Sequence, residues 1–153
     1  MAEVVAFGAS VVAFIQLADR VISLAKEYLE ALKDAPAAIR AIFVQVSALR
    51  AVLQSLDFLT RSQGQTYLGI VQHLGVPSGI LDLCREAVAD LADLLPDEVD
   101  WDSNSGRKRK RIQAAELLIR LPWPFKEERA RKKLDEINRY CQSITLALST
   151  QTV

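Results

Sequence analysis

The chain has 153 residues with 19 basic and 19 acidic side chains, so its formal net charge is zero and no overall field selects a partner. Half of the residues are apolar and a quarter are charged, which is the balance of a soluble globular domain that can bury a core without disulfides or metals. Two cysteines cannot form a disulfide framework, and the N-terminus lacks the basic region and cleavage site of a secretory signal, so we expect an intracellular setting.

Apolar residues recur at helical spacing along nearly the whole chain, which predicts an all-α fold. The first helix is expected over 2–32, before Asp34 and Pro36 mark a break and a restart. Its inward stripe is expected to consist of Phe7, Val11, Phe14, Ala18, Val21, Ile22, Ala25, Leu29 and Leu32. The second helix is expected over 35–60, with an inward stripe of Ile39, Ile42, Phe43, Val46, Leu49, Leu53, Leu56 and Leu59.

Glycine and proline interrupt the middle of the chain more often. Residues 61–76 contain Gly64, Gly69 and Gly75, and they predict a short helix over 67–73 at most. A third helix is expected from Pro77 and Ser78 to residue 95, where Pro96 ends it. Its inward residues are expected to be Ile80, Cys84, Ala87, Val88, Leu91 and Leu95.

The last third of the chain predicts a polar loop over 97–106, a fourth helix over 108–120 and a closing helix over 124–149. Pro124 suits the first turn of the closing helix, where the helix dipole also favours Glu127 and Glu128. Its inward residues are expected to be Ala130, Leu134, Ile137, Tyr140, Cys141, Ile144 and Leu148. Long helices with short connections predict one domain over 1–153, an antiparallel bundle of four or five helices.

Charge is unevenly distributed in the second half of the chain. Residues 82–102 carry eight acids and one base, whereas residues 107–139 carry twelve bases and five acids. Two interpretations stay open. Oppositely charged helix faces can attract each other within the bundle, and a basic stretch can meet an anionic surface.

The order of these segments resembles a known family. An apolar first helix is followed by a second helix that opens near Pro36, and a basic run leads into Leu121-Pro122-Trp123-Pro124-Phe125-Lys126-Glu127. The closing helix ends in Ser143-Ile144-Thr145-Leu146-Ala147-Leu148. Over nearly its whole length, the chain is similar to the HeLo-like N-terminal domains of fungal STAND or NLR-like proteins.

This resemblance implies a helical bundle that precedes a nucleotide-binding oligomerisation domain in a fungal immune or incompatibility receptor. Such bundles are similar to the cell-death bundle of the mixed-lineage kinase-like pseudokinase and to the coiled-coil domains of plant NLRs. In such domains the first helix engages or perforates the plasma membrane after oligomerisation, so the resemblance implies a cytoplasmic protein that moves to that membrane. The chain contains no GxxxxGK[ST] phosphate loop, so we expect an excised domain or a stand-alone relative.

The N-terminal run over 4–18 is the first candidate functional segment. Its fifteen residues carry no charge, and as a helix they span about 22 Å, less than a hydrocarbon core of about 30 Å. A bundle helix buried on most sides explains such a run, and so does a helix that leaves the bundle, assembles with its copies and enters the membrane. In the second case Gly8, Ala9, Ser10 and Ala13 permit close helix contact, and Glu3 faces a wet lumen. The candidate membrane-insertion residues are Glu3, Val4, Val5, Phe7, Val11, Val12, Phe14, Ile15 and Leu17.

A basic cluster is the second candidate, and it consists of Arg107, Lys108, Arg109, Lys110 and Arg111. Five adjacent charges cannot share one helix face, so most of them are solvated. They can pair with the acidic loop over 97–102, contact anionic lipid headgroups, or form a nuclear-localisation or nucleic-acid contact. The few aromatic residues are not interleaved with these bases, so a nucleic-acid partner is not favoured.

The sequence predicts no catalytic, cofactor-binding or metal site. His73 is the single histidine and has no partner ligands at suitable spacing. Cys84 and Cys141 fall on expected core stripes, which predicts buried free thiols. Trp123 is expected to fill a gap between helices or to contact a partner, and Trp101 either packs in the acidic loop or anchors an interaction.

Two functions are therefore retained, and neither is enzymatic. The first is a domain that induces cell death by self-association and by membrane permeabilisation through its N-terminal helix. The second is a soluble adaptor or oligomerisation module that signals through protein contacts alone. An enzyme would need polar groups that converge in a pocket, and the sequence offers no such set.

Overall fold

The computed structural model describes residues 2–31, 36–62, 68–76, 78–95 and 123–151, which are helical nearly throughout. These residues form four long helices, α1 (Ala2–Ala31), α2 (Ala37–Ser62), α4 (Ile80–Leu94) and α6 (Trp123–Gln151), and one short helix, α3 (Leu68–Leu74). The predicted all-α bundle is confirmed. The loop expected over 97–106, the helix expected over 108–120 and Trp101 lie outside the described residues.

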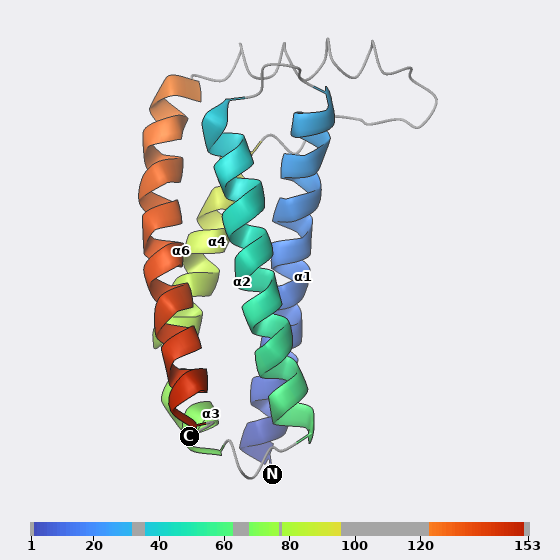
Figure 1. Ribbon diagram of the computed structural model, residues 1–153, viewed down its shortest axis with the longest axis vertical. Helices are drawn as coiled ribbons and strands as arrows, with labels where there is room; N and C mark the ends of the chain where they lie inside the picture. The colour runs from blue at the N-terminus through green and yellow to red at the C-terminus, as the bar shows by residue number, and fades with distance from the viewer. Residues whose placement is uncertain (1, 32–35, 63–67, 77, 96–122, 152–153) are drawn as a thin grey trace, which may run out of the picture.

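The four long helices alternate in direction (Figure 1), so the start of α1, the end of α2, the start of α4 and the end of α6 share one end of the bundle. Helix α3 lies at this same end. Helix α1 packs against α2 and α4, and α6 packs against the same two helices from the other side. Consequently α1 and α6 occupy opposite corners of the bundle.

Each long helix turns one stripe of residues inward, at alternating spacings of three and four. In α1 the buried stripe is Phe7, Val11, Phe14, Ala18, Val21, Ala25 and Tyr28. In α2 it is Ile39, Ile42, Val46, Leu49, Leu53, Leu56 and Thr60. In α4 it includes Leu81, Cys84, Val88 and Leu91 and continues to Leu95, directly after the helix. In α6 it includes Ala130, Leu134, Ile137 and Ile144. This repeat keeps the same stripe of each helix facing its neighbours when the helix axes are nearly aligned, in either direction.

Three predicted stripes shift by one residue. On α4, Leu81 is buried in place of the predicted Ile80, which is half-buried. Tyr28 is buried in place of the predicted Leu29, and Thr60 is buried in place of Leu59; the two leucines are half-buried. Burial of Thr60 leaves no hydroxyl unsatisfied, because its Oγ1 donates to the backbone oxygen of Leu56 at 3.0 Å.

The start of α4 is set by a tight turn rather than by proline. Ser78 has a φ of 60°, in the left-handed region, so the helix begins only at Ile80, after Gly79. The carboxylate of Asp82 accepts a hydrogen bond from the Ser78 backbone N–H at 2.9 Å. A Cβ on Gly79 would lie 2.7 Å from the carbonyl oxygen of Val76, so only glycine fits this turn without displacement.

Candidate membrane-interacting surface

Helix α1 is not sealed inside the bundle. Its outward face exposes Val5, Ala6, Ala9, Ser10, Ala13 and Gln16, and the first charged residue on that face is Arg20. Glycine 8 is also open, because a Cβ placed there would meet no atom within 4 Å. The outer face of the N-terminal half of α1 is therefore built from small or uncharged side chains.

The predicted membrane-insertion residues divide between the two faces of α1. Phe7, Val11 and Phe14 lie in the core, so they can reach lipid only after α1 leaves the bundle. Half-buried positions at its flanks are Val12, Ile15 and Leu17. Val5 is 72% exposed, whereas the side chains of Glu3 and Val4 lie outside those that the structure describes.

Two of the described helices are long and apolar enough to cross a bilayer, judged by length and composition alone. They are Val5–Glu30 in α1 and Ala37–Ser62 in α2, each with 26 residues. The uncharged run over 4–18 is too short to span, whereas the longer stretch of α1 is long enough but contains five charged residues, Asp19, Arg20, Lys26, Glu27 and Glu30. Core helices of soluble proteins pass the same test, so this property permits membrane association without establishing it.

Helix α2 has a second stripe that the sequence prediction missed. Opposite its core stripe it exposes Val44, Ala48, Ala51, Ser55 and Phe58, again at spacings of four and three. The side chain of Val44 is 58% exposed and that of Phe58 is 68% exposed. The sequence contains this stripe as a second series at heptad spacing, but the larger residues of the core stripe on the same helix make it the weaker of the two patterns.

An ion pair joins α1 to α2 midway along the bundle. The Nε of Arg50 contacts the Oδ1 of Asp19, and both side chains are partly exposed. This contact places Asp19, the first charged residue after the uncharged run over 4–18, against the neighbouring helix. Helix α1 is therefore held to the bundle by this ion pair as well as by the apolar contacts of its core stripe.

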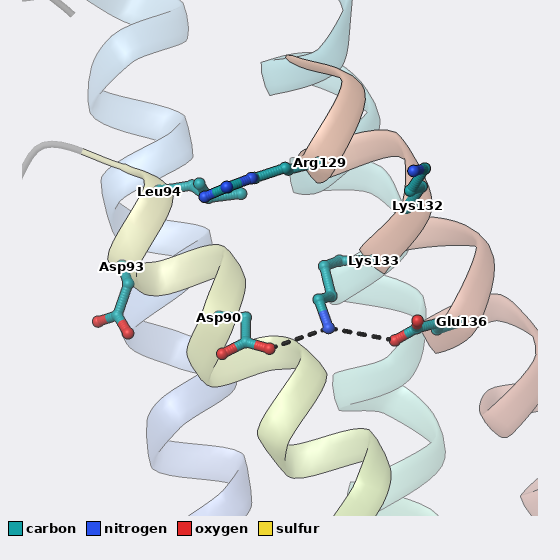
Figure 2. Close-up of a pocket in the computed structure, with 7 residues that line it drawn as sticks. All are labelled: Asp90, Asp93, Leu94, Arg129, Lys132, Lys133 and Glu136. Atoms are coloured by element: carbon teal, nitrogen blue, oxygen red, sulfur yellow. Dashed lines mark ion pairs between the residues drawn. The ribbon is translucent and has the colours of Figure 1, made fainter. Parts of the chain in front are cut away.

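A groove of about 430 Å³ separates the outer sides of α4 and α6 (Figure 2). Lys133 of α6 bridges it, because its Nζ lies 3.0 Å from Asp90 Oδ2 on α4 and 3.5 Å from Glu136 Oε2. The hydrogen bond to Asp90 raises the pKa of Lys133. Arg129 reaches toward Leu94 on α4 in the same view.

This groove mixes acids and bases and shows no preference for one charge. Its lining residues are Asp90, Asp93, Leu94, Arg129, Lys132, Lys133 and Glu136. The Lys133–Asp90 pair supports the interpretation that acidic and basic helix faces attract each other across the bundle. The basic cluster over 107–111 and the acidic loop over 97–102 lie outside the described residues.

The two thiols and the histidine are dispersed. Cys84 is buried on α4, whereas Cys141 on α6 is only half-buried, so the prediction of buried thiols is confirmed for Cys84 alone. Burial raises the pKa of Cys84 to about 12 and also raises the pKa of Cys141. His73 is exposed on α3. Among the described residues, no three side chains of His, Cys, Asp or Glu gather as a metal site would require.

Two exposed faces are thus the strongest functional features of the described residues: the uncharged outer face of α1 and the second apolar stripe of α2. Both belong to the same pair of neighbouring helices. Neither face has the converging polar groups that mark an active site. Comparisons of the chain with protein-family models, with curated proteins and with solved structures give no match.

Proposed function

We propose that this bundle is a membrane-directed effector domain that permeabilises a bilayer after self-association, with α1 as the segment that enters the lipid. In the setting that the HeLo-like resemblance implies, this activity induces cell death for a fungal NLR-like receptor as the domain moves from the cytoplasm to the plasma membrane. The observation that carries the proposal is the position of α1. It lies at a corner of the bundle with an uncharged, exposed outer face.

The length of α1 supports a role inside the bilayer. The stretch Val5–Glu30 has 26 residues, so it extends about 39 Å and exceeds a hydrocarbon core of about 30 Å. Asp19 and Arg20 would then lie near the bilayer centre, where each charge costs about 2.5–3.5 kcal/mol on a single helix. An assembly in which these side chains face one another or a water-filled lumen lowers that cost. Entry of α1 therefore requires self-association.

The two faces of α1 suit two environments in such an assembly. The core face, with Phe7, Val11 and Phe14, loses its bundle contacts when α1 is released but finds an apolar environment again in lipid. The outer face places Ala9 and Ala13 one turn apart. Small residues at this spacing let membrane helices approach closely. We therefore assign the core face to lipid and the outer face to neighbouring copies of α1.

The test is dye release from vesicles of phosphatidylcholine and phosphatidylserine by the full chain and by the double variant Ala9→Leu/Ala13→Leu. Both alanines are exposed in the bundle, so the variant keeps the resting fold, which circular dichroism checks. Leucine at these positions blocks close helix contact in the membrane. We expect release to fall by about tenfold or more, given that packing of small residues drives membrane helix association.

The matched control is Asn138→Leu/Gln142→Leu, which places two leucines at the same spacing on the exposed side of α6. This variant should release dye as fast as the unmodified chain. Equal release by the α1 variant, or no release by the unmodified chain at any concentration, would contradict the role of α1.

A soluble self-association module is the second candidate function, favoured by the outer stripe of α2. Its residues Val44, Ala48, Ala51, Ser55 and Phe58 follow the spacing of a coiled-coil seam. A chain that forms a stable oligomer in solution, yet neither binds nor permeabilises vesicles, would favour this function over the first.

A further inference from the structure

The charged residues are segregated along the long axis of the bundle. The three longest stretches without Asp, Glu, Lys or Arg are 4–18, 62–81 and 140–153. The alternating helix directions bring the described parts of all three to the half of the bundle where α1 begins and α6 ends (Figure 1). We call this half the neutral end. By contrast, ten of the fourteen residues over 126–139 are charged, and all of them except Arg139 lie in the first half of α6, at the opposite end of the bundle.

Large apolar side chains are exposed at the neutral end. They are Val5 on α1, Phe58 on α2, Val76 after α3, Leu83 on α4 and Leu146 on α6. Each of the four helical positions lies within about 8 Å of its helix end along the axis, at about 1.5 Å per residue. The remaining large apolar residue that the structure shows as exposed, Val44, lies on α2 about 21 Å from Phe58 by the same measure.

Four of the charged residues near this end form two ion pairs, while Glu3 on α1 and Glu86 on α4 also belong to this half. Arg61 Nε lies 3.0 Å from Asp57 Oδ1, and Arg85 Nη2 lies 3.5 Å from Asp82 Oδ1. Such short-range pairs cancel most of each other's field at a distance. The neutral end therefore combines exposed apolar side chains with few charged residues and no excess of basic ones.

We infer that the neutral end docks the folded bundle onto a lipid bilayer, with its exposed apolar side chains inserted among the headgroups and the upper acyl chains. Their depth of about 8 Å matches the 5–10 Å to which interfacial segments are buried. A lipid surface fits better than a protein partner, because these side chains are spread over five separate segments around one end rather than gathered on one helix face. The segregation of charge keeps the opposite half in water.

This docking needs no release of α1 and so goes beyond the proposed permeabilisation. It also requires no anionic lipid, because the neutral end offers no excess of positive charge. It would bring the first turns of α1 to the bilayer while the bundle is still folded. Docking can therefore succeed where permeabilisation fails, and the two are measured separately.

The test is co-sedimentation of the full chain with neutral phosphatidylcholine vesicles, with and without about 0.5 M NaCl, which screens exposed charges. We expect binding that is unchanged by salt. Phe58→Glu and Leu146→Glu each remove an inserted side chain and add a charge, so each should lower the partition coefficient by about tenfold or more. Dye release is recorded on the same samples, so that binding without leakage is recognised.

The matched control is Val44→Glu, which places the same charge at a similarly exposed position on the same helix but in the other half of the bundle. It should bind as the unmodified chain does. The inference is overturned if the unmodified chain does not bind neutral vesicles. It is equally overturned if Val44→Glu binds as weakly as Phe58→Glu, or if Phe58→Glu and Leu146→Glu both bind as well as the unmodified chain. It is also overturned if sedimentation velocity shows an oligomer that Phe58→Glu dissociates while no vesicles bind, because the end is then a protein contact.

Discussion

Burial keeps the thiol of Cys84 protonated, since the core of the bundle disfavours the thiolate. Its pKa is raised from 9.0 to about 12, mainly because the side chain is desolvated and secondarily because Cys141 lies nearby. In the unfolded chain this thiol ionises near pH 9, whereas in the folded chain it stays neutral until about pH 12. The folded state then binds more protons than the unfolded state in this window, so its stability falls as the pH rises.

We expect the free energy of unfolding to decrease between pH 9 and 12, by up to about 1.4 kcal/mol per pH unit for this one group. Urea denaturation at several pH values measures it. Because tyrosine and lysine also titrate here, the contribution of Cys84 is the difference between the unmodified chain and Cys84→Ala. Identical pH slopes for the two proteins would show that Cys84 ionises equally in the folded state.

Two of the buried residues that sequence reasoning missed share one cause. Tyr28 and Thr60 look less suited to a core than the leucines beside them, and composition therefore favoured Leu29 and Leu59. In the bundle, the inward stripe keeps its repeat of three and four instead of drifting around the helix. Packing against the other helices thus determines whether Tyr28 or Leu29, and Thr60 or Leu59, is buried. The sequence of one helix alone does not determine this choice.

At the scale of the helices, the ion pair between Asp19 and Arg50 holds α1 against α2. Both side chains are more than a third exposed, at 47% and 39%, so solvent screens much of their attraction. We expect Asp19→Ala to lower the free energy of unfolding by no more than about 1 kcal/mol. We also expect it to speed amide hydrogen exchange in α1 specifically, because the contact joins two helices.

Asp57→Ala provides the control for this prediction. It removes the pair that Asp57 makes with Arg61 within α2, and that pair does not connect two helices. Exchange in α1 should then stay as in the unmodified chain, as measured by mass spectrometry of peptides from α1. Equal acceleration of α1 exchange by both variants would show that Asp19 does not act as a link.

The helices themselves could be predicted from sequence with small errors at their ends. The breaks at Pro36 and Pro96 were readable because proline restricts both itself and the preceding residue. The start of α4 was placed too early, because the left-handed Ser78 and the close approach of Gly79 to Val76 depend on the path of the turn. Proline at a helix start is a frequent choice, but here a turn precedes the helix instead.

For the molecule as a whole, one continuous core joins α1, α2, α4 and α6. Leu49 lies fully buried in it, so Leu49→Ala should lower the free energy of unfolding by about 2–5 kcal/mol. Val44→Ala, on the exposed side of the same helix, should cost about 0.5 kcal/mol or less. Thermal unfolding followed by circular dichroism measures both.

Because the core is shared, we expect a single cooperative transition in both variants, at a lower temperature for Leu49→Ala. Two separate transitions, with part of the helicity lost early, would instead show that the helices unfold as independent units.

Only part of the candidate surface could be predicted from the sequence. The uncharged run over 4–18 was visible because fifteen consecutive residues lack charge. The neutral end was not, because its three uncharged stretches are far apart along the chain and meet only through the alternation of helix directions. The outer stripe of α2 also depended on which side of that helix its neighbours leave uncovered.

The shared position of the start of α1 and the end of α6 has a practical consequence for imaging this protein in cells (Figure 1). A fluorescent protein fused to either end of this chain would lie between the neutral end and the bilayer. It would therefore obstruct the proposed docking that the fusion is meant to report. A small dye coupled through Lys26→Cys, on the exposed side of α1 near the other end, would leave that approach open.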